Sequence, residues 1–385
     1  MTHHYLDHAA TSAVRPPEVA AAMTRYLEAC GATPGRGGHR LALEAGRMVL
    51  EARRAVMGVL GLEGDPGRVT FGLNATHAIN TALRGVLSAG DVLVVTALDH
   101  NAVLRPAHAL ARERGVQVRL VPASPDGTPE GDAYRRAVRG ARLVSLNAVS
   151  NVLGSRLPVE EMAERARSEG ALVLVDTAQS AGHVPVDLSG ADLVAFTGHK
   201  GLLGPQGTGG LWVRPGVAVA PLLRGGTGGN SLDPEMPEAY PDHLEAGTLN
   251  GPGLAGLLAG CRVVEREGVA RIHARERELK QVLREGLMGV PGVMVLSPAD
   301  PEGAGIVTVT ADWSDPAALA HTLDRDFGVL ARAGLHCAPG VHRVLGTTKT
   351  GALRLSVGWG STRADAEAAV AAVRALAHAT APAPR

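Results

Sequence analysis

Short apolar runs alternate with segments of helical periodicity over residues 43–215. Seven runs predict strands, at Val69–Phe71, Val92–Thr96, Val116–Val121, Leu143–Leu146, Leu172–Val175, Leu193–Phe196 and Gly210–Val213. The segments between them predict helices, among them Ala75–Leu87, Val103–Arg114, Pro129–Val138 and Val159–Ser168. Several runs are almost entirely Val and Leu, as in strands that are buried on both faces. The pattern therefore predicts a doubly wound, mostly parallel α/β sheet with helices on both faces.

The pattern changes beyond this region. A Gly/Pro-rich stretch from Leu223 to Pro252 predicts a long functional or interfacial loop. Helices near 253–267, 269–287, 315–326 and 363–378, with strands at Val293–Leu296, Ile306–Thr310 and Leu353–Val357, then predict a smaller α+β domain. The 385 residues exceed the roughly 100–200 of one domain. We expect a large domain of residues 16–250, a small domain of residues 251–385 joined by residues 1–15, and a frayed tail from residue 379.

Composition excludes several classes of function. Lys plus Arg and Asp plus Glu balance at 38 each, and the chain has three Trp, four Tyr and three Phe, which argues against a nucleic-acid surface. No apolar run reaches the roughly 18 residues of a membrane helix, and the N-terminus lacks the features of a secretory signal. Cys30, Cys261 and Cys337 are too few and too scattered for a disulfide framework or a metal cluster. We expect a cytoplasmic protein without a metal, a membrane or nucleic acid as partner.

Lysine is rare in this chain. Only three of the 38 basic residues are lysines, namely Lys200, Lys280 and Lys349. Lysine, unlike arginine, can lose its proton near neutral pH and act as a nucleophile. Lys280 lies in an alternately charged helix, where we expect it to be solvated, and Lys349 lies in a predicted turn. Only Lys200, which follows a strand and lies between Gly198 and Gly201, is placed for chemistry.

Reactive side chains follow several predicted strands, and ligands of such sheets bind beyond the carboxyl ends of the strands. Asp176 and Lys200 end successive strands, so a carboxylate and an amine face one pocket, unless they form a buried ion pair. The segment GLNATHAIN opens a helix after a strand, which favours an anion near Thr76; an ordinary helix start capped by Asn74 is the alternative. No GxGxxG or GxxxxGK[ST] motif lies in a suitable place, which disfavours a nucleotide-binding module.

A lysine amine, a phosphate site and a deeper carboxylate together suit pyridoxal 5'-phosphate. The motifs YLDHAATS, DHNAV, SNVLG, VDTAQS, FTGHKG, EAGTLN, RAGLHCAP and LRLSVG occur in this order over about 350 residues. In this order and spacing they resemble the class V aminotransferase fold, specifically its cysteine desulfurase branch. The resemblance implies fold type I of the pyridoxal phosphate enzymes, with a large seven-stranded cofactor-binding domain and a small α+β domain. It also implies a homodimer with shared active sites.

The resemblance also implies roles for single residues. Lys200 matches the lysine that binds the cofactor aldehyde, Asp176 the partner of the pyridine nitrogen, Gln179 that of the ring hydroxyl, and His100 the residue that stacks on the ring and shuttles protons. The matching phosphate contacts are Ala75, Thr76, Thr197 and His199, with Thr248 supplied by the neighbouring subunit. Asn151, which also matches a cofactor-binding residue, and Arg354, aided by Arg332, match the residues that hold the substrate carboxylate.

Cys337 distinguishes between possible reactions. It lies in a loop bounded by Gly and Pro, beside His336 and near Arg332, and a cationic, partly exposed setting makes a thiol nucleophilic. The resemblance implies that this thiol takes sulfur from L-cysteine as a persulfide, releases L-alanine, and passes the sulfur to an acceptor protein. A selenocysteine lyase, a class V aminotransferase with an idle Cys337, and a non-catalytic protein that retains the fold are the alternatives. We expect Cys30 and Cys261 to be packed and inert.

Overall fold

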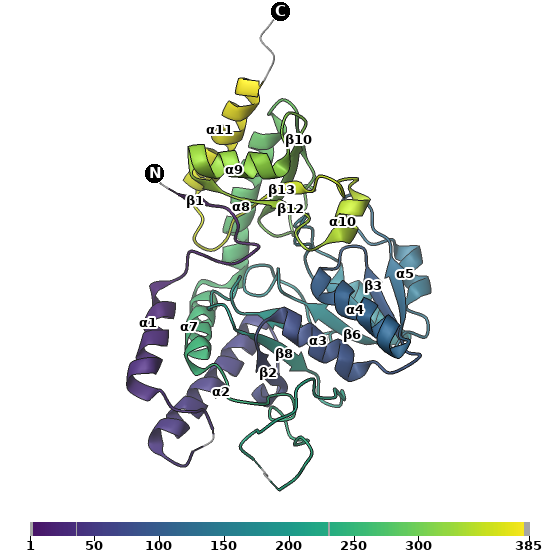
Figure 1. Ribbon diagram of the computed structural model, residues 1–385, viewed down its shortest axis with the longest axis vertical. Coiled ribbons are helices and arrows are strands. Elements are labelled where there is room, and N and C mark those ends of the chain that lie inside the picture. The colour runs from purple at the N-terminus through teal and green to yellow at the C-terminus, as the bar shows by residue number, and fades with distance from the viewer. Residues whose placement is uncertain (1–2, 36, 230–231, 381–385) are drawn as a thin grey trace, which may run out of the picture.

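The computed structural model describes residues 3–35, 37–229 and 232–380 (Figure 1). The chain begins with β1 (His4–Tyr5), α1 (Pro17–Arg25), the π-helical turn η1 (Tyr26–Cys30), α2 (Arg40–Leu60) and the short 3₁₀-helix η2 (Pro66–Arg68). The large sheet and its helices follow as β2 (Val69–Gly72), α3 (Ala75–Val86), β3 (Val92–Thr96), α4 (Asn101–Arg114), β4 (Gln117–Val121), α5 (Gly131–Ala137), β5 (Leu143–Asn147), α6 (Val159–Ser168), β6 (Leu172–Asp176), β7 (Leu193–Thr197) and β8 (Gly209–Val213).

The last part of the chain contains α7 (Gly251–Glu267), α8 (Val269–Met288), β9 (Val293–Val295), β10 (Ile306–Ala311), α9 (Pro316–Phe327), β11 (Val329–Leu330), β12 (Arg332–Gly334), α10 (Pro339–Val344), β13 (Ala352–Ser356) and α11 (Arg363–Thr380). Residues 381–385 of the tail that was expected to fray lie outside the described residues, and α11 includes residues 379 and 380.

The large sheet has the order β2-β8-β7-β6-β5-β3-β4. Strand β8 runs antiparallel to both of its neighbours, and the other adjacent strands pair in parallel. The predicted seven-stranded, mostly parallel sheet is therefore confirmed. The carboxyl ends of β2, β3, β5, β6 and β7 lie along one edge, the edge at which ligands of such sheets bind.

Helices cover both faces of this sheet because alternate side chains of each strand point to opposite sides. On β3, Val92 and Val94 pack in a core with α2, α6 and α7, whereas Leu93 and Val95 pack on the other face with α3 and α4. Local signals start the two helices nearest the site. The Asn74 side chain accepts from the His77 N–H and starts α3, and the His100 ring caps α4.

A four-stranded antiparallel sheet of order β12-β13-β10-β9 forms the centre of the small domain. Helices α8, α9 and α11 pack on this sheet, and Leu6 of the N-terminal segment packs in the same core. Strand β1 pairs in parallel with β11, which brings the N-terminal segment beside the small domain (Figure 1). Strands β1, β11 and β12 were not predicted, because two or three residues are too few to show a periodicity.

The division into residues 16–250 and residues 251–385 with 1–15 stays a proposal. The pairing of β1 with β11 supports assigning the N-terminal segment to the small domain. Helix α7 begins at residue 251 and therefore falls within the proposed small domain. However, its Leu254, Leu257 and Leu258 pack in the core under the large sheet, so α7 packs with the large domain. Between β8 and α7 no helix or strand forms in the described residues, in agreement with the predicted long loop.

A buried ion pair anchors this long loop. Both carboxylate oxygens of Glu245 bind the guanidinium of Arg53 on α2, at 2.8 and 2.7 Å. Glu245 Oε1 also accepts from the Phe71 N–H at 2.5 Å, and Arg53 donates to the Val69 carbonyl. The loop is therefore tied to the strand that leads into α3.

Candidate active site

One cavity of about 220 Å³ lies at the carboxyl edge of the large sheet, closed by the N-terminal segment and the small domain. All but one of the predicted site residues line it: Ala75, Thr76, His100, Asn151, Asp176, Gln179, Thr197, His199, Lys200, Arg332, Cys337 and Arg354. Thr248 does not line this cavity and is exposed. The structure thus brings together residues that are up to 279 positions apart in the sequence, and their individual roles stay predictions.

Lys200 and Asp176 face the same cavity from neighbouring strand ends. Asp176 closes β6 and accepts from the Ala178 N–H at 2.9 Å. Burial raises the pKa of Asp176, and the positive charge of Lys200 opposes this shift. Burial also lowers the pKa of Lys200 to about 8; Asp176 raises it, while Arg354 and Arg332 lower it further. Within the described part of the chain, the two side chains form no ion pair within 4.0 Å, so the alternative of a closed Lys200–Asp176 pair is not observed.

The end of the cavity at α3 suits an anion. Asn74 caps the helix through the His77 N–H at 3.0 Å, and this bond leaves the N–H groups of Ala75 and Thr76 in the first turn for a ligand. The Thr197 hydroxyl is buried and, among the described residues, has no hydrogen-bond partner. A buried donor of this kind is expected to bind something that the protein itself does not supply.

Three further side chains are held by the segments around the cavity. His100 Nδ1 accepts from the Ala102 N–H at 3.0 Å, so the neutral ring carries its proton on Nε2. Burial, followed by the charge of Lys200, lowers the pKa of His100 to about 4. His199 Nδ1 lies 3.0 Å from the Thr11 hydroxyl, and the same two causes lower its pKa to about 4. The Gln179 amide donates to the Ala9 carbonyl at 2.9 Å.

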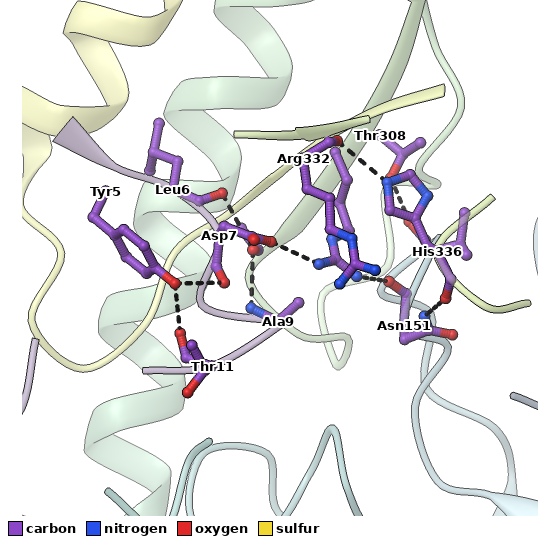
Figure 2. Close-up of polar contacts among 12 residues, drawn as sticks. Tyr5, Leu6, Asp7, Ala9, Thr11, Asn151, Thr308, Arg332 and His336 are labelled. Carbon is purple, nitrogen blue, oxygen red and sulfur yellow. Dashed lines mark hydrogen bonds and ion pairs between the residues drawn. The ribbon is translucent and has the colours of Figure 1, made fainter. Parts of the chain in front are cut away.

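Arg354 links the N-terminal segment to the large domain. Its side chain is almost fully buried, its Nη2 binds Asp7 Oδ1 at 2.7 Å, and its Nη1 donates to the Asn151 carbonyl at 3.0 Å. Asn151 Nδ2 in turn donates to the His336 carbonyl at 2.7 Å (Figure 2). Burial lowers the pKa of Arg354, and Asp7 opposes that shift. The guanidinium is therefore fixed in the cavity by an acid and a backbone carbonyl.

Cys337 lies between β12 and α10, is exposed, and lines the cavity. Its carbonyl accepts from the Asn101 N–H at 2.7 Å. His336 and Cys337 both have a left-handed backbone, with φ of 49° and 56°, and Leu203 in the turn after Lys200 has φ of 59°. In the described chain these are the non-glycine residues with positive φ, and all three lie in the two loops that carry the amine and the thiol. Such strain persists only where the surrounding structure enforces it.

The family model Aminotransferase class-V matches residues 4–369. The chain belongs to the class V aminotransferase family. It is 37% identical over 360 residues to the probable cysteine desulfurase of Methanothermobacter thermautotrophicus, covering 91% of this chain and 88% of that protein. A cysteine desulfurase of Cereibacter sphaeroides is 32% identical over 381 residues, covering 95% and 93%.

Solved structures give the same family. The apo structure of a cysteine desulfurase from Thermococcus onnurineus superimposes with a TM-score of 0.91 at 31% identity, covering 98% of this chain and 95% of that one. The cysteine desulfurase CsdA of Escherichia coli superimposes with a TM-score of 0.87 at 26% identity, covering 98% and 96%. The predicted fold and family are therefore confirmed.

In this class V aminotransferase family member, the structure contradicts the prediction for Lys280 and confirms the predicted burial of Cys261. Lys280 was expected to be solvated, and this is wrong: its side chain is buried and Nζ donates to the Asp300 carbonyl at 3.1 Å. The reason is its place on α8, one position after Leu279 and three before Leu283, on the face that packs inward. The expected burial of Cys261 is confirmed, and burial raises the pKa of its thiol.

Sequence reasoning missed Asp7, the partner of Arg354, and Asn147, which ends β5 and lines the cavity beside Asp176. Asn147 carried the same signal as Asp176, a polar residue directly after an apolar run. Asp7 gave no such signal, since it precedes the sheet by some 60 residues. In residues 3–35, 37–229 and 232–380, no cluster of three or more His, Cys, Asp and Glu side chains could hold a metal ion. In the same ranges no helix is long and apolar enough to cross a membrane.

Proposed function

We propose that this chain is a pyridoxal phosphate-dependent cysteine desulfurase, which converts L-cysteine to L-alanine and retains the sulfur as a persulfide on Cys337. The observation that carries the proposal is that an amine of lowered pKa, a buried carboxylate and an exposed thiol share one cavity. The amine and the carboxylate serve any enzyme of this cofactor class. The thiol favours sulfur removal over amino-group transfer.

The residues present fit pyridoxal phosphate. The unpartnered Thr197 hydroxyl, Thr76 and the first N–H groups of α3 form a donor set for a phosphate. Asp176 would hold the pyridine nitrogen in its protonated form, and Lys200 would bind the aldehyde. When bound, the protonated ring withdraws electrons from the bonds to the substrate Cα.

The side chains around the cavity have separate tasks toward the amino acid. Arg354, with Arg332 and Asn151, would bind the α-carboxylate, a task that suits a fixed guanidinium. Lys200 Nζ would take the proton from Cα, because a pKa of about 8 leaves a substantial fraction of the amine neutral at pH 7 to 8. His100 carries its proton on Nε2 and would deliver that proton there, accepting one at the same nitrogen only afterwards.

Cys337 receives the sulfur. Its thiolate would attack the substrate sulfur; the S–S bond forms, the bond from sulfur to Cβ breaks, and Cβ gains a proton, so that L-cysteine and the enzyme thiol give L-alanine and the enzyme persulfide. His336 does not supply positive charge to this thiol, since burial and Arg354 lower the pKa of His336 to about 3. The cations that line the cavity with Cys337 are Arg332, Arg354 and protonated Lys200.

A homodimer with shared active sites is part of the proposal. Thr248 is exposed and lies outside the cavity of its own chain, as required of a residue that contributes to the site of a second copy. The exposed position of Cys337 leaves the persulfide open to a sulfur-acceptor protein. The cytoplasmic location expected from the sequence also stays part of the proposal.

The test compares L-cysteine and L-selenocysteine side by side, with alanine, sulfide and selenide quantified. We expect L-alanine from L-cysteine and a persulfide on Cys337 detected by mass spectrometry. The wild type and Cys337→Ala should both bind the cofactor with its visible absorbance, and borohydride should attach the cofactor to Lys200. Cys337→Ala should lose persulfide formation, whereas Cys30→Ala, which removes a half-buried thiol outside the cavity, should keep it.

Each alternative predicts a different product. Selenide released far faster than sulfide would support a selenocysteine lyase. An oxo acid with a transferred amino group would support an aminotransferase. A purified protein that takes up no cofactor would contradict every reading that makes this chain an enzyme of this class.

A further inference from the structure

Cys337 is held between two parts of the molecule. Before it, β12 pairs with β13 in the small sheet. After it, Ala338, which directly precedes α10, and Val341 on α10 pack in the large-domain core with Ala97 and Leu98. The backbones approach closely at Gly340, where a Cβ atom would lie 2.2 Å from the Ala97 carbonyl oxygen. The thiol therefore occupies a short bridge between the two domains, and α10 lies over the large domain beside β3 and α4 in Figure 1.

A chain of polar contacts crosses the same bridge. The Thr347 hydroxyl lies 2.8 Å from His342 Nδ1, and His342 Nε2 lies 3.4 Å from His336 Nδ1. His336 Nε2 lies 3.2 Å from the Arg332 carbonyl of β12 (Figure 2). Both rings are buried, His342 completely.

The hydrogen bonds in this series of contacts all run the same way, from the Thr347 hydroxyl to the Arg332 carbonyl. A carbonyl only accepts, so His336 Nε2 carries a proton. Burial, followed by the charge of Arg354, lowers the pKa of His336 to about 3, so the ring is neutral and its Nδ1 accepts. His342 Nε2 must then donate, and burial lowers the pKa of His342 as well. Its Nδ1 therefore accepts from the Thr347 hydroxyl. Both nitrogens of His336 are engaged, and neither is available to the thiol.

We propose that His342 is a positioning residue for Cys337, acting through His336; this rests on the proposed role of Cys337 as sulfur acceptor. His336 and Cys337 hold a left-handed backbone that relaxes unless contacts enforce it. Their carbonyls are held by Asn151 Nδ2 and the Asn101 N–H, each at 2.7 Å. The His342 contact fixes the His336 ring, and loss of His342 leaves a buried acceptor on His336 without a donor.

The Asn101 amide reports on this loop independently of catalysis. Asn101 is the first residue of α4, so its N–H has no acceptor within the helix, and the Cys337 carbonyl is its partner. Its hydrogen exchange therefore requires opening of the Cys337 loop rather than of the helix. The experiment measures this exchange by NMR in the holoenzyme.

The decisive variants are His342→Leu, which removes both ring nitrogens, and His342→Gln, whose amide can still accept from Thr347 and donate to His336. We expect His342→Leu to accelerate exchange of the Asn101 amide by roughly tenfold, the loss of one hydrogen bond, and His342→Gln to change it little. His321→Leu, the same change at an exposed histidine on α9, is the matched control and should leave the rate unchanged.

Unchanged exchange in a folded His342→Leu protein would overturn the proposal, and so would equal acceleration by Leu and Gln. If His342→Leu does not fold, exchange of the Asn101 amide is measured in Thr347→Val, which removes the donor to His342 at constant volume. Faster exchange in Thr347→Val would support the proposal, and unchanged exchange would overturn it.

In turnover with L-cysteine, we expect His342→Leu to slow persulfide formation while KM and the cofactor absorbance stay unchanged, since His342 does not line the cavity. A rise in KM with an unchanged rate would overturn the proposal. A wild type that forms no persulfide would refute the proposed function, while the exchange rates still test whether His342 holds the loop.

Discussion

Lys200 should titrate near pH 8 in the cofactor-free protein, because burial disfavours its charged form more than Asp176 favours it. At pH 7.5 a pKa of about 8 leaves roughly a quarter of the amine neutral, whereas the ordinary value near 10.5 leaves roughly one part in a thousand. The site thus raises the concentration of the nucleophilic form by about two hundredfold before any cofactor binds.

The scarcity of lysine makes this measurable. Reductive methylation with ¹³C-formaldehyde labels the three lysines and the α-amino group, and Lys200→Arg identifies the Lys200 resonance. The Lys200 resonance should titrate with a midpoint near 8. Asp176→Asn should move the midpoint lower, because the Asp176 charge raises the Lys200 pKa. A midpoint near 10.5, or an upward shift in Asp176→Asn, would refute the reasoning.

The same shift links the stability of the cofactor-free protein to pH. The folded-state pKa is lower than the unfolded one, so between about pH 8 and 10.5 the unfolded chain binds a proton that the folded chain does not, and Lys200 makes stability rise with pH. A difference of about 2.5 pKa units corresponds to roughly 3 kcal/mol. Lys200→Met has no such titration. The unfolding free energy of Lys200→Met minus that of the wild type should therefore fall by roughly 3 kcal/mol between about pH 8 and 10.5.

Two acids that pair with buried arginines give further predictions. Asp7→Asn removes the charge that faces Arg354 at 2.7 Å, so we expect the free energy of unfolding to fall by about 1–3 kcal/mol and KM for L-cysteine to rise about tenfold; urea titration and steady-state kinetics check this, and an unchanged KM would contradict the role of Asp7. Glu245→Gln leaves the buried Arg53 guanidinium without its counter-charge, so we expect a loss of about 3 kcal/mol in thermal unfolding; an unchanged melting temperature would show that the pair is dispensable.

The large sheet could be predicted from the sequence because most of its strands contain short runs rich in Val and Leu, such as Val92–Val95 in β3 and Leu172–Val175 in β6. Strands β1, β11 and β12 could not be predicted, since their pairing partners rather than their own sequences define them. Strand β1 forms because His4 lies opposite Val329, more than 300 residues away. Lys280 was misjudged for a related reason: the charge pattern of α8 suggests a solvated helix, while the positions of its leucines place Lys280 on the buried face.

The part of the site that follows the strands of the large sheet could be predicted from the sequence. Asp176 and Lys200 follow apolar runs, and a parallel sheet brings such residues to one edge. Asp7 was not predictable in this way, because it reaches Arg354 only through the pairing of the N-terminal segment with the small domain.

Backbone strain adds information that no side-chain pattern carries. The sequence does not show that Leu203, His336 and Cys337 have a positive φ. A positive φ usually selects glycine, and none of these residue types indicates one. Each such residue costs on the order of 1–3 kcal/mol, so a fold selected for stability alone would place glycine there. Glycine at these positions would relieve the strain and loosen the loop. The side chains at these positions oppose the observed backbone, so neighbouring contacts must hold the loops; for the Cys337 loop these include the hydrogen bonds from Asn151 and Asn101 to the His336 and Cys337 carbonyls.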